Sequence, residues 1–252
     1  KFTRSAQPAA KCIEFEMASY KEAPRSRLDA FERMKKYWNC RIAMTNSTEV
    51  VNFIGHYYFN QLAAELNSSL AFFSEVGENT GSVNAHFAFS RGAARTYGKP
   101  WGIDMSAWMQ GFITDFSKSH FWGDSSRAGG DGGHSMSLFR RVYYTAYMAG
   151  ASQLIAEAGS VNWFLEELNA SSGALALSPL GYIGQEVAAF AREHTVRGIT
   201  YTPIGIVLQN GHGLGIGWMY SGKAWDVFPL TDGERQATYL LETVWPKSWQ
   251  VM

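Results

Sequence analysis

The sequence predicts an α/β protein built as a (β/α) TIM barrel, and three observations support this. Short apolar runs alternate regularly with amphipathic stretches of helical spacing, a pattern typical of parallel strands joined by crossover helices. Polar residues stand repeatedly at the carboxyl ends of the predicted strands, where barrel proteins carry their chemistry. No glycine-rich phosphate loop follows the first predicted strand. A doubly wound sheet fits the alternation as well, but the last two observations favour the barrel.

The predicted elements follow from local periodicity. Apolar or alternating runs indicate strands at residues 11–17, 41–45, 70–76, 101–106, 152–156 and 204–209. Apolar residues spaced three and four apart indicate helices at residues 27–38, 50–66, 84–97, 138–149, 184–194 and 232–243. Gly98 and Pro100 are stop signals after one helix, and Gly150 ends another.

Five strand–helix units precede residue 204, whereas a closed barrel has eight. We therefore expect residues 1–198 to form the C-terminal part of a barrel. Its other strands would precede Lys1, lie on another chain, or lie in segments that we have assigned otherwise. From residue 199 onward a strand with Pro203 and a glycine-rich turn precede a polar helix, so we expect residues 199–252 to begin a second α/β domain.

The composition limits the classes of partner. Hydrophobic residues make up 46% of the chain and charged residues 17%, so a sizeable core is expected. The formal net charge is zero and no cluster of Lys and Arg accompanies interleaved aromatics, so we expect no nucleic acid partner. No apolar run is long enough to span a membrane. Most of the nine Trp are expected in the core, although such an aromatic-rich chain mildly favours carbohydrate as the ligand.

Sequons and cysteines favour a secreted protein. Sequons begin at Asn46, Asn67 and Asn169, and we expect a glycan on at least one of them. Cys12 and Cys40 each stand at the start of a predicted strand, and one crossover helix joins these strands. Neighbouring strands lie about 4.8 Å apart and a disulfide accepts Cα separations of roughly 4.4–6.8 Å, so we expect a Cys12–Cys40 bridge.

Three glutamates are the candidate catalytic residues. Glu75 and Glu78 lie in SEVGEN after an apolar strand, where Gly77 allows the backbone to bend. Glu157 ends the apolar run LIAE and is followed by small residues that leave space for a ligand. Glycoside hydrolysis requires two carboxyl groups facing each other across the scissile bond. The alternative is structural, because any of these glutamates can cap a helix or form an ion pair.

Further polar and aromatic residues near predicted strand ends are candidate substrate contacts, namely Asp104, Trp108, Glu16, Asn79 and Trp163. The polar and glycine-rich loop at 117–137 is expected to shape the site from above. Its His and Asp residues match no known metal-ligand spacing, and we expect neither a metal nor another cofactor. The G-x-S-x-G motif, which carries the catalytic serine on the nucleophile elbow of α/β-hydrolases, is absent from the sequence.

Several segments together carry a family resemblance, namely FFSEVGEN, AFSRGAARTYGKPWG, LIAEAG, LSPLG and YTPIGIVLQNGHG. With these segments the chain resembles TIM-barrel glycoside hydrolases, particularly the beta-galactosidase-like group. In that group a flavodoxin-like or amidotransferase-like domain follows the barrel. The resemblance implies a retaining mechanism in which Glu157 is the nucleophile and Glu75 or Glu78 is the acid/base.

The chain departs from that group at one place. Such enzymes carry an Asn-Glu pair at the end of their fourth strand, whereas here the comparable strand at 41–45 leads into Asn46 and Ser47. If Ser47 occupies the place of the acid, the resemblance implies an inactive barrel. Two hypotheses follow. One is a secreted glycoside hydrolase-like protein that acts on or binds carbohydrate. The other is an inactive barrel glycoprotein that serves as a structural or assembly module of an extracellular structure, with other chains or further parts of the same polypeptide as partners.

Overall fold

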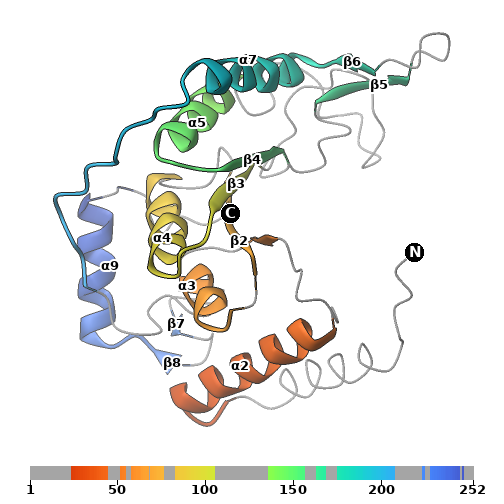
Figure 1. Cartoon of the computed structure of the whole chain (residues 1–252). Coiled ribbons are helices and arrows are strands. Elements are labelled where there is room, and N and C mark those ends of the chain that lie inside the picture. Colours follow the sequence, from red (N-terminus) through yellow and green to blue (C-terminus); the bar gives the residue numbers. More distant parts are fainter. Residues whose placement is uncertain are drawn as a thin grey trace, which may run out of the picture.

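The computed structural model shows a mixed α/β protein with a parallel sheet (Figure 1). It describes residues 24–44, 52–54, 58–67, 69–76, 83–105, 136–156, 163–168, 175–207, 223–224, 228–244 and 246. None of the helices in these ranges is long and apolar enough to cross a membrane.

The sheet contains four parallel strands in the order β1-β2-β3-β4. They are β1 (Asn52–Ile54), β2 (Ala71–Val76), β3 (Trp101–Met105) and β4 (Gln153–Ala156). The connections carry α3 (Tyr58–Glu65), α4 (Val83–Thr96) and α5 (Met136–Met148). The strand predictions at 70–76, 101–106 and 152–156 are therefore confirmed as neighbouring parallel strands.

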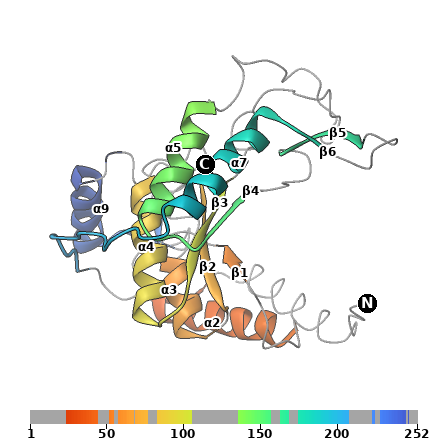
Figure 2. The ribbon, with the colours of Figure 1, turned by 45° about the horizontal axis from the view of Figure 1, so that its top comes forward.

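The strands follow one another across the sheet in chain order. Because βαβ crossovers are right-handed in almost all proteins, this order keeps the connecting helices on one face. Figure 2 shows α3, α4 and α5 along the same side of β2 and β3. A doubly wound sheet instead reverses its strand order and has helices on both faces. The four strands are thus wound in one sense, as in part of a barrel or in one half of a doubly wound sheet.

An apolar core lies between the sheet and these helices. Phe72, Ile103 and Met105 from the strands and Phe139 from α5 are fully buried in it. Phe87 of α4 packs against Trp101 of β3, with ring centroids 5.6 Å apart. The alternating apolar residues of β2 and β3 and the apolar stripes of α4 and α5 thus form one cluster, because each must leave water on the same side of the sheet.

After β4 the chain forms a two-stranded antiparallel pair and a long helix. The pair is β5 (Phe164–Leu168) with β6 (Leu175–Leu177), and the helix is α7 (Pro179–Glu193). Ser178 caps α7, since its Oγ accepts a hydrogen bond from the backbone N–H of Gly181 at 3.0 Å. Arg140 of α5 pairs with Glu186 at 3.0 Å, which joins α7 to α5.

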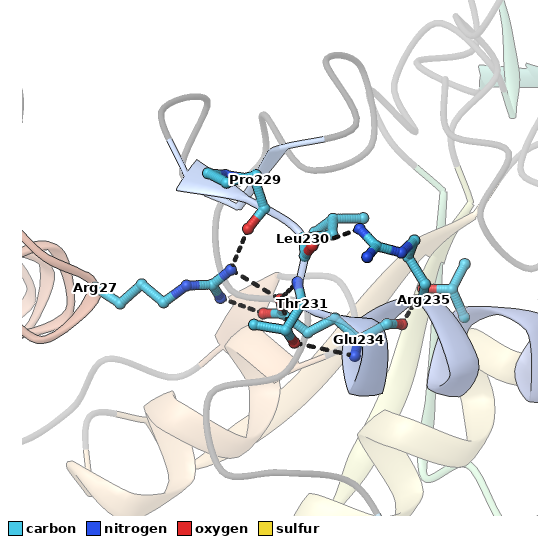
Figure 3. A network of polar contacts seen from close by, with 7 residues as sticks. Arg27, Pro229, Leu230, Thr231, Glu234 and Arg235 are labelled. Atoms are coloured by element: carbon cyan, nitrogen blue, oxygen red, sulfur yellow. Dashed lines mark hydrogen bonds and ion pairs between the residues drawn. The ribbon is translucent and has the colours of Figure 1, made fainter.

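The C-terminal part contains β7 (Lys223–Ala224), β8 (Phe228–Pro229) and α9 (Asp232–Val244). Figure 3 shows how α9 is tied to α2 (Arg27–Met44). Arg27 forms an ion pair with Glu234 and donates a hydrogen bond to the carbonyl oxygen of Pro229 at 2.6 Å. Glu234 also accepts from the backbone N–H of Thr231 at 2.7 Å, while the Thr231 hydroxyl accepts from the backbone N–H of Glu234. This is a capping box whose acid is shared with a distant arginine.

Two predicted elements were wrong in type. Residues 41–44 belong to the last turn of α2 and not to a strand, because the helical spacing of apolar residues continues from Trp38 to Ile42. The predicted helix at 50–66 begins only at Tyr58, and the strand β1 precedes it. The comparison of Asn46 and Ser47 with a strand-end Asn-Glu pair therefore loses its structural basis.

A third prediction, the strand at 204–209, was also wrong for the residues that are described. Residues 204–207 form neither strand nor helix and are largely exposed. A strand is stable only when another strand pairs with it, and no such partner reaches these residues within the described ranges. The predicted helices at 84–97, 138–149, 184–194 and 232–243 are present as α4, α5, α7 and α9, with shifted ends. The predicted strand at 11–17 lies outside the described residues.

Candidate functional site

Two acidic residues meet at the carboxyl end of the sheet. Glu75 is the fifth residue of β2 and lies in register with Asp104 on β3. Paired residues of parallel strands point to the same face, and neighbouring strands are about 4.8 Å apart. Asp104 is buried, with 6% of its surface exposed, whereas Glu75 is partly exposed. The structure thus brings together two of the sequence-predicted site residues.

The direction of Glu75 follows from the contacts of the residue before it. Ser74 faces α4, because its hydroxyl donates to the carbonyl oxygen of His86 at 3.1 Å and contacts the hydroxyl of Ser90. Asn60 of α3 donates to the same Ser90 hydroxyl at 2.7 Å. Since successive strand residues alternate between faces, Glu75 points to the face opposite α4, and Asp104 does too.

An apolar floor lies two residues earlier on the same face. Phe73 and Gly102 are in register there, and Phe73 is fully buried. A Cβ on residue 102 would overlap the Phe73 ring and the carbonyl oxygen of Gln153, so only glycine allows this close approach. The two carboxylates therefore lie above a tightly packed apolar layer.

Tyr143 on α5 is a buried polar residue that the sequence analysis did not single out. Burial raises the pKa of its hydroxyl. The nearby indole N–H of Trp163 lowers this pKa, and the negative charge of Asp104 raises it. Within the described part of the chain, neither the Tyr143 hydroxyl nor the Trp163 Nε1 makes a hydrogen bond of normal geometry, so we take the two groups as near neighbours and not as a bonded pair. The signal in the sequence was a hydroxyl-bearing residue inside the apolar stripe of Phe139, Val142 and Ala146.

The sequence-predicted substrate residue Trp163 packs against α7. It is half-buried, and its ring lies 3.5 Å from the position that a Cβ on Gly184 would take. Its carbonyl oxygen accepts a hydrogen bond from the backbone N–H of Ser178 at 2.9 Å. In this position the indole supports the start of α7 more than it offers an open stacking face.

The other predicted site residues lie outside the described ranges, namely Glu157, Glu78, Asn79, Trp108 and Glu16. Glu157 is the next residue in the chain after Ala156, the last residue of β4. Among the described residues, no group of three or more His, Cys, Asp or Glu side chains is arranged to hold a metal ion.

Asn67 is the one candidate glycosylation site within the described ranges, since Asn46 and Asn169 lie outside them. Asn67 is exposed at the turn between α3 and β2, and its φ of 51° is left-handed. Its side-chain oxygen accepts a hydrogen bond from Lys99 Nζ at 2.6 Å. The turn lies at the amino end of the sheet, away from Glu75 and Asp104.

Only one cysteine of the predicted disulfide lies within the described residues. Cys40 lies half-buried in α2, and Cys12 is outside the described residues. The geometric reason for the bridge was wrong, because Cys40 is in a helix and not at the start of a strand. The Cys12–Cys40 bridge itself stays a prediction.

Comparisons with known proteins identify no relative: no protein-family model, no curated protein and no solved structure matches the chain.

Proposed function

We propose that the chain is a secreted, carbohydrate-active protein of the glycoside hydrolase type, with its site at the carboxyl end of the parallel sheet. The observation that carries the proposal is the register of Glu75 with Asp104 at that end. Barrel proteins build their sites there, and glycoside hydrolysis requires paired carboxyl groups. The winding of the four strands in one sense is compatible with part of a barrel.

The strand order suggests how the acids divide the work. β3 lies between β2 and β4, so Asp104 lies between the strand of Glu75 and the strand that leads into Glu157. In the proposed reaction Glu157 attacks the anomeric carbon while Glu75 or Glu78 protonates the departing oxygen. Water then cleaves the glycosyl ester and gives its proton to the same acid/base. Asp104 accepts a hydrogen bond from a substrate hydroxyl.

The proposal extends to the organisation of the chain. Residues 1–198 would form the C-terminal part of a (β/α) barrel, and residues 199–252 would begin a second α/β domain. Closure of the barrel requires strands beyond the four described here.

The test is hydrolysis of aryl glycosides, with an aryl β-galactoside as the first substrate. We expect Glu157→Gln, which removes the proposed nucleophile, to abolish hydrolysis. We expect one of the two variants Glu75→Gln and Glu78→Gln to lower kcat about 10² to 10⁴-fold, the range for removal of an acid/base group. Glu65→Gln is the matched control. Glu65 is exposed at the end of α3, where the chain enters the amino end of β2, and the proposed site is at the carboxyl end. An unchanged kcat in Glu157→Gln would contradict its assignment as the nucleophile. An unchanged kcat in the variants of Glu75 and Glu78 would contradict the assignment of the acid/base.

One observation favours the second candidate, a barrel glycoprotein without catalysis. Asp104 is 6% exposed, which leaves little of its carboxylate open to a substrate. The same assays separate the two candidates. A chain that hydrolyses none of the glycosides and binds none of the free sugars is the inactive structural or assembly module.

A further inference from the structure

The sequon at residues 67–69 lies at the turn between α3 and β2, and its two essential residues are exposed to different degrees. An acceptor site for an N-linked glycan needs the asparagine and a Ser or Thr two positions later. Asn67 is exposed, whereas only 4% of Ser69 is exposed. A transferase therefore meets the asparagine of the folded chain but not the hydroxyl that it has to recognise.

The hydroxyl of Ser69 is held by the first residue of β2. Its Oγ donates to the carbonyl oxygen of Ala71 at 2.5 Å and accepts from the backbone N–H of Ala71 at 3.3 Å. Ala71 is buried and begins the strand that pairs with β3. A transferase that binds the hydroxyl must first break these bonds and open the strand end, which costs free energy for each buried group that is left without a partner.

Lys99 fastens the turn from the connection that leads into β3. Its Nζ donates to Asn67 Oδ1 at 2.6 Å and to the carbonyl oxygen of Ser69, and it lies 5.7 Å from the ring centroid of Phe72. Beside it, the carbonyl oxygen of Pro100 accepts from the backbone N–H of Phe72 at 3.2 Å. Lys99 stands 32 residues after Asn67. The contacts that close the turn thus come from a part of the chain that is synthesised later than the sequon.

We propose that folding closes the sequon, so that Asn67 accepts a glycan only before β2 pairs with β3. A transferase that acts during synthesis meets the sequon before Lys99 and β3 fold onto it. Once the contacts of Ser69 and Lys99 have formed, the chain is no longer an acceptor at Asn67. Closure has a consequence only for a chain that meets such a transferase, so it rests on the proposed secretion.

The contacts of the turn leave an attached glycan compatible with the fold. In the transfer, Asn67 Nδ2 bonds to the anomeric carbon of a sugar carried on a lipid diphosphate. The bond from that carbon to the diphosphate oxygen breaks, the diphosphate leaves with the electron pair, and one amide proton passes to a base of the transferase. Lys99 bonds to Oδ1, which the glycan leaves in place. A chain that is glycosylated at Asn67 therefore forms the same turn.

The experiment compares two sequons on one molecule, with purified oligosaccharyltransferase and a lipid diphosphate-linked oligosaccharide. Glu193→Asn creates a second sequon with His194 and Thr195 at the end of α7, where all three positions are exposed. Peptide mapping by mass spectrometry gives the rate of modification at each sequon. In the folded variant we expect Asn67 to react at least tenfold more slowly than position 193, because the transferase has to wait until the turn opens.

An unfolded chain supplies the second comparison. Phe139→Asp, added to Glu193→Asn, places a charge at a fully buried position on α5 and should unfold the chain. Circular dichroism checks the loss of structure, and Ile103→Asp is added if any structure remains. Both sequons are unchanged by these substitutions. In the unfolded chain we expect Asn67 and position 193 to react at similar rates.

Three outcomes overturn the proposal. In the first, Asn67 and position 193 react equally fast in the folded chain. In the second, Asn67 stays bare in the unfolded chain, which would show that the sequon is not accepted at all. In the third, position 193 also stays bare in the folded chain, which would show that the contacts of Ser69 and Lys99 are not the cause. The purified transferase acts on the chain whatever its natural compartment, so a failure here is distinct from a failure of the proposed secretion or hydrolysis.

Discussion

Arg27 and Glu234 are 207 residues apart in the chain and form an ion pair that joins the first turn of α2 to the first turn of α9. The Glu234 side chain is 8% exposed and the Arg27 side chain 36%, so the pair is sheltered mainly on the acidic side. Only Glu234 and Leu241 of α9 are buried among the described residues, so this contact is a large part of what holds the helix.

We expect Arg27→Ala to lower the free energy of unfolding by about 1–3 kcal/mol, because it removes a donor from a nearly buried carboxylate. Chemical denaturation measures this change. Asp232→Ala, which breaks the exposed pair with Arg235, is the control and should cost about 0–1 kcal/mol. Equal effects of the two changes would show that the pair does not hold α9.

The ion pair between Arg27 and Glu234 also predicts that the free energy of unfolding depends on pH in the acidic range. Burial alone would raise the pKa of Glu234, but hydrogen bonds from Arg27 and Thr231 outweigh it and lower the pKa below its ordinary value of 4.5. Its contribution to stability is therefore complete above the unfolded-state pKa and is lost as the pH falls through the folded-state pKa. Denaturation at a series of pH values should show a smaller acid loss in Glu234→Gln than in the unchanged chain.

The burial of the Tyr143 hydroxyl predicts that the free energy of unfolding depends on pH in the alkaline range. Burial holds the pKa of its hydroxyl above the ordinary value of 10.0. The unfolded chain then loses this proton at lower pH than the folded chain, so stability declines as the pH rises above about 10. Tyr143→Phe should remove part of that decline, whereas Phe at the exposed Tyr182 should not. A Tyr143 that titrates in the folded protein like a free phenol would contradict the burial of its hydroxyl.

Asn67 predicts a glycan that leaves the proposed site open. Chain made in a glycosylating host should carry added mass at Asn67, which Asn67→Gln removes, as intact-mass measurement shows. Because the turn lies at the amino end of the sheet, the change should leave glycoside binding or hydrolysis unaltered. A bare polypeptide from such a host would count against secretion.

The strands and helices with strong local signals were predictable, and those that depend on longer context were not. The run LAFFSEV is apolar on both faces and could be assigned as β2 from the sequence. RIAMT looks similar over five residues, and only its continuity with the spacing of Leu28, Phe31, Met34 and Trp38 identifies it as helix. β1 has three residues, too few for any periodicity to show.

The candidate site was predictable where it depends on strand ends. Glu75 and Asp104 lie near the carboxyl ends of apolar runs. Because the two strands pair in parallel, these ends lie side by side in the sheet. Tyr143 and Trp163 meet through the packing of α5 against α7, and no local pattern reports that contact. The register of Phe73 with Gly102 is likewise a property of the sheet and not of either segment.

The most direct test of the proposed activity is to trap the nucleophile with an activated 2-deoxy-2-fluoro galactoside, whose glycosyl ester hydrolyses slowly. Peptide mapping by mass spectrometry then identifies the residue that carries the sugar. The two-carboxylate account predicts one adduct per chain, on Glu157, and none in Glu157→Gln. An adduct far from the carboxyl ends of β2, β3 and β4, or no adduct at all, would contradict it.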